Sequence, residues 1–336
     1  MTRFSKLALA APHPALWTAT LAIAAVDGAW LAYRGISVAP LGFSIVAACV
    51  ATLIAAGVFW TLVKPEPTLR AMALSTACLL AFTIALAVLH YLAATLERPL
   101  VDQQLAAAEA ALGFDWPAHV AFLDAHPALA RGLALAYHST GPQVALVVIA
   151  LSASRRLGRL WRFVRLFAIT LLAVIAVSAL FPAEGPYAFY KGLDSGTSQL
   201  ETIGATWHLE PLSRLRSGEP SRLALTEMRG LATFPSFHVC LALITAWALA
   251  PIRVVGPLAV LLNGAVVIAT IGSGGHYLPD VLAGAILGGF VLAYPGLAAK
   301  WRRRGEWRRR GEMRVPVGER LVTPRPSLVQ VRARAR

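Results

Sequence analysis

Long apolar runs alternate with short polar connections over most of this chain, and this alternation limits it to folds that cross a membrane several times. An α-helix needs about 20 apolar residues to cross a bilayer, and eight runs approach or reach that length. Hydrophobic residues make up 57% of the chain and charged residues only 14%, whereas soluble domains have about 25% charged residues. The sequence therefore predicts an all-α, polytopic membrane helix bundle. The eight predicted membrane helices cover residues 15–33, 38–63, 71–95, 129–151, 163–180, 234–250, 255–271 and 279–297.

A charged stretch at residues 97–128 separates the third predicted membrane helix from the fourth. Its acidic residues stand among leucines and aromatic residues, a mixture typical of helices at a membrane surface. We expect one or two interfacial helices here, which lie on the membrane or re-enter it. Beyond Glu97, at its start, the acidic residues are Asp102, Glu109, Asp115 and Asp124.

The chain carries a formal net charge of +14, which on its own would suggest a nucleic-acid partner. Residues 300–336 hold thirteen Lys or Arg against three Glu, so this tail contributes +10 of the total. The sequence WRRRGE occurs there twice in succession, over residues 301–312. Basic segments beside a membrane bind anionic lipid headgroups. We expect a disordered cytoplasmic tail that binds such headgroups, and no nucleic-acid partner.

The distribution of Lys and Arg between short loops predicts the orientation of the chain, because such residues are enriched on the cytoplasmic side. Placing the basic residues 155–165 in the cytoplasm also places Lys64, Arg70, Arg253 and the tail there. The acidic stretch at residues 97–128 and the long loop at residues 181–233 then fall on the extracytoplasmic side.

Two polar motifs stand out at the ends of residues 234–280, where FPSFH begins the stretch and GGHYLPD ends it. The two apolar runs between them lead down and back across the membrane, so both motifs return to the extracytoplasmic side. Asp280 follows His276 by four residues and therefore lies on the same helical face, where it can bind one ring nitrogen. With His238 nearby, two imidazoles and one carboxylate form a nucleophile and acid–base set.

The first motif also predicts an anion site. Ser236 stands where a helix begins, and the free backbone N–H groups of a helix start favour anions. Further positive charge is available from the loop that precedes it. Its basic residues are Lys191, Arg214, Arg216, Arg222 and Arg229.

The blocks FPSFH and GGHYLPD resemble the second and third signature motifs of the phosphatidic acid phosphatase type 2 (PAP2) superfamily. The likeness is strongest over residues 181–289, and LSRLRSG resembles a basic segment that precedes the second motif in the bacterial branch. The most similar branch contains inositolphosphotransferases of the inositol phosphorylceramide synthase kind. The resemblance implies that His276 is a nucleophile that forms a phosphohistidine, that Asp280 orients it, and that His238 is the acid–base partner.

Two departures from the superfamily pattern concern phosphate binding. Thr270 stands where an arginine would precede the third-motif histidine, and the pattern of Lys followed seven positions later by Arg-Pro is absent. Neutralisation of the phosphate must then come from other residues. We expect it from Lys191, Arg216 and Arg229, together with Ser236.

The sequence thus predicts an integral membrane phosphoesterase or phosphotransferase that acts on a lipid phosphoester, with water or an alcohol such as inositol as acceptor and without a cofactor or metal. We expect N-terminal spans and interfacial helices over residues 1–128, a PAP2-like catalytic membrane core over 129–299, and the basic tail over 300–336. The resemblance implies a bacterial inner-membrane protein with its active site on the extracytoplasmic side.

Two other classes of protein remain open. A non-catalytic transporter or scaffold would tolerate loss of the motif histidines, although no charged series across several spans supports a proton path. Asp27, His90 and His138 are further polar residues within apolar runs, where such residues are often functional. An intramembrane metalloenzyme could use His238, His276 and Asp280 as ligands, although no H-E-x-x-H motif is present.

Overall fold

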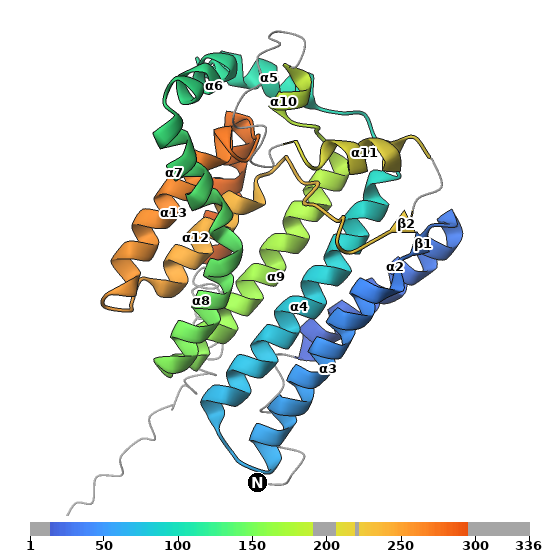
Figure 1. Cartoon of the computed structure of the whole chain (residues 1–336), viewed down its shortest axis with the longest axis vertical. Helices are drawn as coiled ribbons and strands as arrows, with labels where there is room; N and C mark the ends of the chain where they lie inside the picture. Colours follow the sequence, from blue (N-terminus) through green and yellow to red (C-terminus); the bar gives the residue numbers. More distant parts are fainter. Residues whose placement is uncertain (1–13, 191–205, 219–221, 295–336) are drawn as a thin grey trace, which may run out of the picture. The chain divides into compact units, whose positions relative to one another are not determined.

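The computed structural model describes residues 14–190, 206–218 and 222–294, and over these residues it is almost entirely helical (Figure 1). The described residues up to Leu292 belong to one compact unit. The predictions made for Lys191 and for the basic tail lie outside the described residues.

Most helices follow one another with short connections, whereas longer segments separate α10, α11 and α12. Proline occupies the first turn of several, including α3, α4 and α7, where its missing N–H costs no intrahelical hydrogen bond. Two short strands, β1 (Ser37–Val38) and β2 (Arg222–Leu223), form a parallel pair. The helices are α2 (Pro14–Arg34), α3 (Pro40–Leu62), α4 (Pro67–Ala94), α5 (Asp102–Ala111), α6 (Trp116–Ala125), α7 (Pro127–His138), α8 (Thr140–Ala153), α9 (Leu157–Leu180), α10 (Pro186–Phe189), α11 (Leu209–Arg216), α12 (Phe237–Leu249), α13 (Val255–Gly272) and the helix Leu278–Tyr294.

The all-α membrane bundle is confirmed, whereas the number of eight spans is not. Within the described residues, five helices are long and apolar enough to cross a bilayer: α2, α3, α4, α9 and α13. The pair α7 and α8 is bent by 48° and would make a sixth span if the two were counted together. The two remaining predicted spans are the shorter apolar helices Phe237–Leu249 and Leu278–Tyr294. The first begins three residues later than predicted, where Ser236 forms its N-cap, and the second begins at Leu278, with its described part ending at Tyr294.

The basic segment before α9 differs from the predicted loop. Helix α9 already begins at Leu157, so most of this segment forms its first turns. The guanidinium of Arg159 lies 4.0 Å from the ring centroid of Trp247, and its Nε donates to the Ala248 carbonyl over 2.9 Å. Part of this charge therefore fastens α9 to the end of α12.

The main core lies between α4, α8, α9 and α12, which pack against one another in pairs. Helices α2 and α3 pack on the outside of α4 and leave many apolar side chains exposed. Such an apolar outer surface is expected of helices that face lipid. The core residues include Cys78, Val147, Leu151, Phe163, Val164, Ile244 and Leu249.

Two glycines bring the two motif helices together. The spacing of Gly284 and Gly288 predicts a close helix contact, and the structure confirms it. A Cβ atom at Gly284 would lie 2.5 Å from the Ser236 carbonyl oxygen, and one at Gly288 would lie 3.1 Å from the Cα of Cys240. Only glycine lets these backbones approach so closely.

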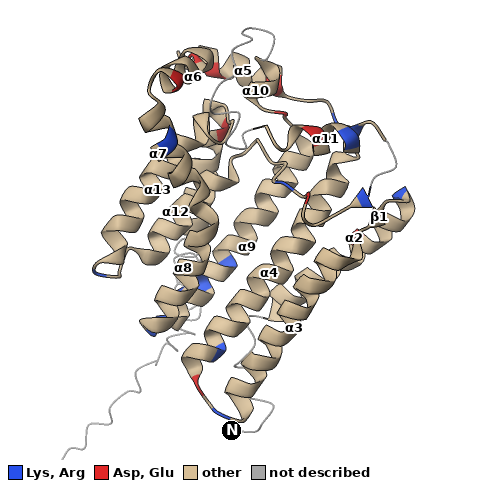
Figure 2. Ribbon diagram, viewed as in Figure 1, with Lys and Arg blue, Asp and Glu red and all other residues tan. Residues whose placement is uncertain are grey.

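Charge is unevenly distributed along the bundle. Figure 2 shows Lys and Arg at the α3–α4 connection, at the start of α9 and at the α12–α13 connection, away from α5 and α6, which carry acidic residues. This is the pattern from which the orientation was predicted, and the orientation itself stays a prediction.

The stretch at residues 97–128 contains two short helices, α5 and α6. Of its acidic residues, however, Asp102 and Glu109 are buried, with exposed fractions of 6% and 1%. They point into the protein, against the expectation for a helix that lies on a membrane surface.

Candidate active site

The turn at residues 273–277 joins α13 to the helix Leu278–Tyr294 and carries His276; we call it the histidine turn. Both His276 and Asp280 are almost fully buried. The Nδ1 atom of His276 lies 3.3 Å from Asp280 Oδ2, and the same oxygen accepts a hydrogen bond from the Tyr277 N–H over 2.9 Å. The carboxylate is thus fixed by its own helix start, and the i, i+4 pair predicted from the sequence is present.

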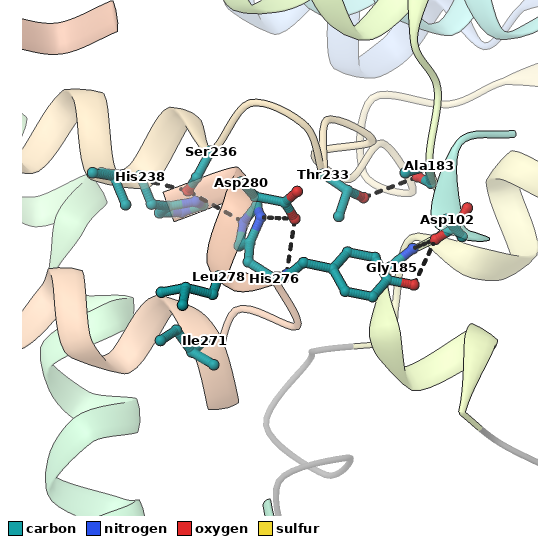
Figure 3. A network of polar contacts seen from close by, with 12 residues as sticks. Asp102, Ala183, Gly185, Thr233, Ser236, His238, Ile271, His276, Leu278 and Asp280 are labelled. Carbon is teal, nitrogen blue, oxygen red and sulfur yellow. Dashed lines mark hydrogen bonds and ion pairs between the residues drawn. The ribbon is translucent and has the colours of Figure 1, made fainter. Parts of the chain in front are cut away.

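Ser236 links the first motif to the second. As the N-cap of α12, it accepts a hydrogen bond from the Val239 N–H through its Oγ. This Oγ lies 3.4 Å from His276 Nε2, and the Ser236 N–H donates to the Asp280 carbonyl over 3.1 Å. Figure 3 shows His276 between Ser236 and Asp280, each at a different ring nitrogen.

His238 lies in the first turn of α12 and contacts a residue that the sequence interpretation missed. The Tyr137 hydroxyl, from α7, lies 3.1 Å from His238 Nδ1, and the two rings are 4.2 Å apart at an angle of 31°. The adjacent residue that stands out in the sequence is His138, a polar residue within an apolar run. Nothing in the local sequence distinguishes Tyr137, because the fold alone brings α7 to this position.

A cavity of about 410 Å³ brings the two histidines together, as the sequence predicts. This volume lies within the usual range of small-molecule sites, about 300–1,000 Å³. An apolar wall comes from side chains of α4 and α9, although α4 also contributes polar residues such as Thr83 and His90, and most other polar side chains come from outside these two helices. The apolar lining includes Ile84, Ala87, Leu171, Val174 and Ile175, and the polar lining includes Tyr137, His208, Arg229, Thr233, His238 and His276.

The predicted phosphate-binding residues lie in different places. Arg229 lines the histidine cavity, with its guanidinium 5.4 Å from the ring centroid of Trp207. Arg216 lines a different, smaller hollow and donates to the Arg98 carbonyl over 3.0 Å. Thr270, at the position of the superfamily arginine, is buried and donates to the Val266 carbonyl over 2.7 Å.

A second cavity, of about 520 Å³, adjoins the first. The two share Tyr91, Trp207, Met228 and Arg229 in their linings. Beyond these residues the second cavity is lined mainly by α11 and by the segment around β2, with both acidic and basic side chains. A polar compartment therefore adjoins the half-apolar one.

Two other polar residues noted in the apolar runs, His90 and Asp27, lie in different surroundings. His90 lines the histidine cavity, where its Nε2 lies 3.2 Å from the Ser178 Oγ. Asp27 is buried in α2, and its Oδ1 has no hydrogen-bond partner among the described residues.

Burial governs the protonation of the site. It lowers the pKa of His276 to about 4, although the Thr233 carbonyl opposes this change. It also lowers the pKa of His208, whose Nε2 donates to the Glu184 carbonyl over 2.7 Å. His276 is therefore neutral near pH 7, and an Nδ1–H bonded to Asp280 leaves Nε2 unprotonated, facing the Ser236 Oγ at 3.4 Å.

The described part of the chain contains no group of three or more His, Cys, Asp or Glu side chains that could hold a metal ion. What this site offers is a neutral, oriented imidazole, a second imidazole and a cationic side chain at the edge of a half-apolar cavity.

Fold and site together define an integral membrane protein with a buried histidine–carboxylate pair. Over residues 103–294 the chain matches the PAP2 superfamily, and it belongs to that superfamily. Its members are typically phosphatases or phosphotransferases, so membership indicates a phosphoesterase of the lipid-phosphatase type. No curated protein and no solved structure matches the chain.

Proposed function

We propose that the chain transfers the phosphoryl group of a lipid phosphoester through a phosphohistidine at His276, as in the inositolphosphotransferase-like branch of the superfamily. The observation that carries this proposal is the shared cavity, where the oriented His276–Asp280 pair meets His238 beside an apolar wall. An apolar wall suits a lipid chain, and a neutral imidazole suits attack on phosphorus.

In the first step, Nε2 of His276 attacks phosphorus, and the bond from phosphorus to the leaving alcohol oxygen breaks. His238, which enters this step in its protonated form, donates a proton to that oxygen and becomes neutral, while Asp280 stabilises the positive charge on the His276 ring. In the second step, His238 removes a proton from the acceptor hydroxyl, whose oxygen attacks phosphorus. The bond from phosphorus to Nε2 then breaks and restores neutral His276.

The acceptor decides between hydrolysis and transfer, because the same residues serve both reactions. Water gives a phosphatase, whereas an alcohol such as inositol gives a phosphotransferase. The second cavity, which shares Trp207 and Arg229 with the first, is the compartment in which we place a polar headgroup or an acceptor alcohol.

Arg229 is the first candidate for phosphate neutralisation, because it lines the histidine cavity. Lys191, Arg216 and Ser236 remain further candidates. We also propose that the site faces the extracytoplasmic side of a bacterial inner membrane. The basic tail would then contact anionic headgroups on the cytoplasmic side. In this proposal residues 1–128 form the N-terminal spans and interfacial helices, residues 129–299 the catalytic core, and residues 300–336 the tail.

An assay of the purified chain tests this function. The protein is incubated with a panel of labelled phospholipids, with and without inositol, and products are separated into hydrolysed and transferred lipid. Turnover in the presence of a chelator, with loss in His276→Ala, supports the proposal. Loss on chelation, with recovery on adding a divalent metal, favours the metalloenzyme. No turnover of any lipid would favour a transporter or scaffold.

A further inference from the structure

The histidine turn is held from outside by a helical cap, which we define as α5, α6, α10 and residues 182–185. Four contacts join the cap to the turn and its flanks. Trp116 Nε1 donates to the Ile271 carbonyl over 3.4 Å, and the Tyr187 hydroxyl donates to the Gly272 carbonyl over 3.2 Å. The other two contacts end on buried carboxylates of α5.

Asp102 is the first of these carboxylates and joins three segments. Its Oδ1 accepts hydrogen bonds from the Gly185 N–H over 2.8 Å and from the Tyr277 hydroxyl over 3.0 Å. Its Oδ2 accepts one from the Glu184 N–H over 3.0 Å. Figure 3 shows Asp102 beside Gly185 in this network. Tyr277 directly follows His276 and is fully buried, so its hydroxyl has this carboxylate instead of water.

Gly185, which donates its N–H to Asp102, lies too close to the histidine turn for a larger residue to replace it. Its φ of +95° is a conformation that other residues rarely adopt, and a Cβ atom there would lie 2.9 Å from the Gly275 carbonyl oxygen. The backbone that Asp102 holds thus lies directly against the histidine turn.

Glu109 is the second carboxylate, two helical turns along the same face of α5. Its Oε2 accepts a hydrogen bond from the Leu278 N–H over 2.6 Å. Leu278 is the first residue of the helix that carries Asp280, and helix starts leave N–H groups without intrahelical partners. Glu109 therefore acts as the cap of that helix from a distant part of the chain. Its Oε1 is buried and has no partner among the described residues.

We propose that Asp102 and Glu109 are positioning residues for the reaction, which hold the residues on the C-terminal side of His276 so that its Nε2 points into the cavity. This inference rests on the proposed role of His276. Asp102 fixes Tyr277 through its side chain, and Glu109 fixes Leu278 through its backbone. Displacement of a reacting atom by about 1 Å can cost about 100-fold in rate, so these contacts should act on turnover rather than on substrate binding.

The test compares variants that differ in one hydrogen bond. Glu109→Gln keeps an acceptor oxygen for the Leu278 N–H, whereas Glu109→Ala removes it. Tyr277→Phe removes the hydroxyl that reaches Asp102 and keeps the ring. Both side-chain oxygens of Asp102 accept hydrogen bonds. Asp102→Asn replaces one of these oxygens with an NH2 group, which cannot accept, so this variant should keep less turnover than Glu109→Gln. Gln104→Ala, on the exposed face of α5, is the matched control.

The expected result is a fall in kcat of about 10–100-fold for Glu109→Ala and Tyr277→Phe, with KM nearly unchanged. Glu109→Gln should recover most of the turnover, and Gln104→Ala should match the parent chain. Turnover is measured per folded molecule with a nitrophenyl phosphoester in detergent. Unchanged kcat in Glu109→Ala and Tyr277→Phe, whatever their thermal stability, would overturn the proposal.

A second measurement is independent of activity. Nitrogen NMR of labelled histidine reports the tautomer of His276, whose signal is identified by its loss in His276→Ala. We expect Glu109→Ala and Tyr277→Phe to shift this signal and Gln104→Ala to leave it in place; unshifted signals would contradict the inference. If His276→Ala keeps full activity, the proposed function fails, even where the cap variants do shift the signal.

Discussion

The histidine pair and the helical cap both place buried carboxylates beside backbone N–H groups, but they differ in how far along the chain each carboxylate finds its partner. Asp280 meets His276 four residues away. Asp102 and Glu109 meet Tyr277 and Leu278 at separations of 175 and 169 residues. A partner one helical turn away can be inferred from spacing alone, whereas a partner on another helix depends on the tertiary fold.

The sequence around the acidic residues of the cap therefore predicts only interfacial helices. One feature of the sequence, however, indicates that two of these residues are buried. Asp102 and Glu109 are seven residues apart, which places them on one face of a helix, and the apolar residues Leu105 and Ala106 lie between them and are also buried. A carboxylate on an apolar face is costly to bury without a hydrogen-bond donor, so such a pattern predicts a buried donor opposite.

The largest expected effect concerns the His276–Asp280 pair, whose partners lie close together in the sequence. His276→Ala removes the nucleophile, and turnover should fall to the uncatalysed level with every substrate. No phosphorylated protein should be trapped after acid quenching with a labelled phosphoester. A phosphoenzyme that persists in this variant would show that another residue forms the covalent bond.

His238→Ala should have the next largest effect. Loss of a general acid usually lowers turnover by about 10²–10⁴-fold, and a substrate with an acidic leaving group needs little protonation. A nitrophenyl phosphoester should therefore partly rescue His238→Ala and leave His276→Ala inactive. Rescue of His276→Ala alone would exchange the roles of the two histidines. Tyr137→Phe is a milder companion variant, since it removes only the hydroxyl beside His238.

The cap itself can be tested through its stability. Leu123 in α6 is 2% exposed and packs with Trp116 and Tyr187, whereas the adjacent Phe122 is 50% exposed. Leu123→Ala should cost about 2–5 kcal/mol of unfolding free energy, and Phe122→Ala should cost less. Thermal unfolding midpoints in detergent provide the comparison. A larger loss for Phe122→Ala would mean that the face exposed here is buried in solution.

Two arginines give a smaller effect that separates the candidates for phosphate binding. Arg229 lines the histidine cavity and Arg216 does not. A hydrogen bond to a charged group contributes about 1.5–3 kcal/mol, so Arg229→Ala should raise KM by about tenfold or more. Arg216→Ala should leave KM unchanged, and the reverse order would move the phosphate site toward α11.

The membrane bundle and the His276–Asp280 pair could be predicted from patterns that are local in the sequence. Apolar run length predicted the membrane bundle, and the spacing of His276 and Asp280 predicted their pair. Gly284 and Gly288 predicted the close helix contact. The number of spans did not follow, because α12 is shorter than its apolar run suggests and a bend divides the run at residues 129–151 between α7 and α8. Partners such as Tyr137, His208 and Glu109 did not follow either, since only tertiary packing brings them to the histidines.

The smallest expected effect is a flat pH response, which tests how fully the site is buried. A nucleophilic imidazole must be neutral, and protonation removes activity as the pH falls through its pKa. An ordinary histidine, with a pKa of about 6.5, would lose most of its neutral form between pH 7 and 5. The pKa of His276 is lowered to about 4 by burial, so its neutral form should persist down to about pH 5 and decline through about pH 4.

The measurement is kcat/KM between pH 3.5 and 7.5 with bis(nitrophenyl) phosphate, a diester without a second ionisation. Asp280, His208 and Glu109 also titrate close to the turn. Burial raises the pKa of Glu109 to about 7, partly opposed by the Leu278 N–H, so its ionisation falls within the measured range. The profile is therefore repeated in Glu109→Gln, which removes that ionisation. An acid limb near pH 6.5 in both proteins would mean that water reaches His276, and that the cap and the loop before α12 leave the histidine turn open.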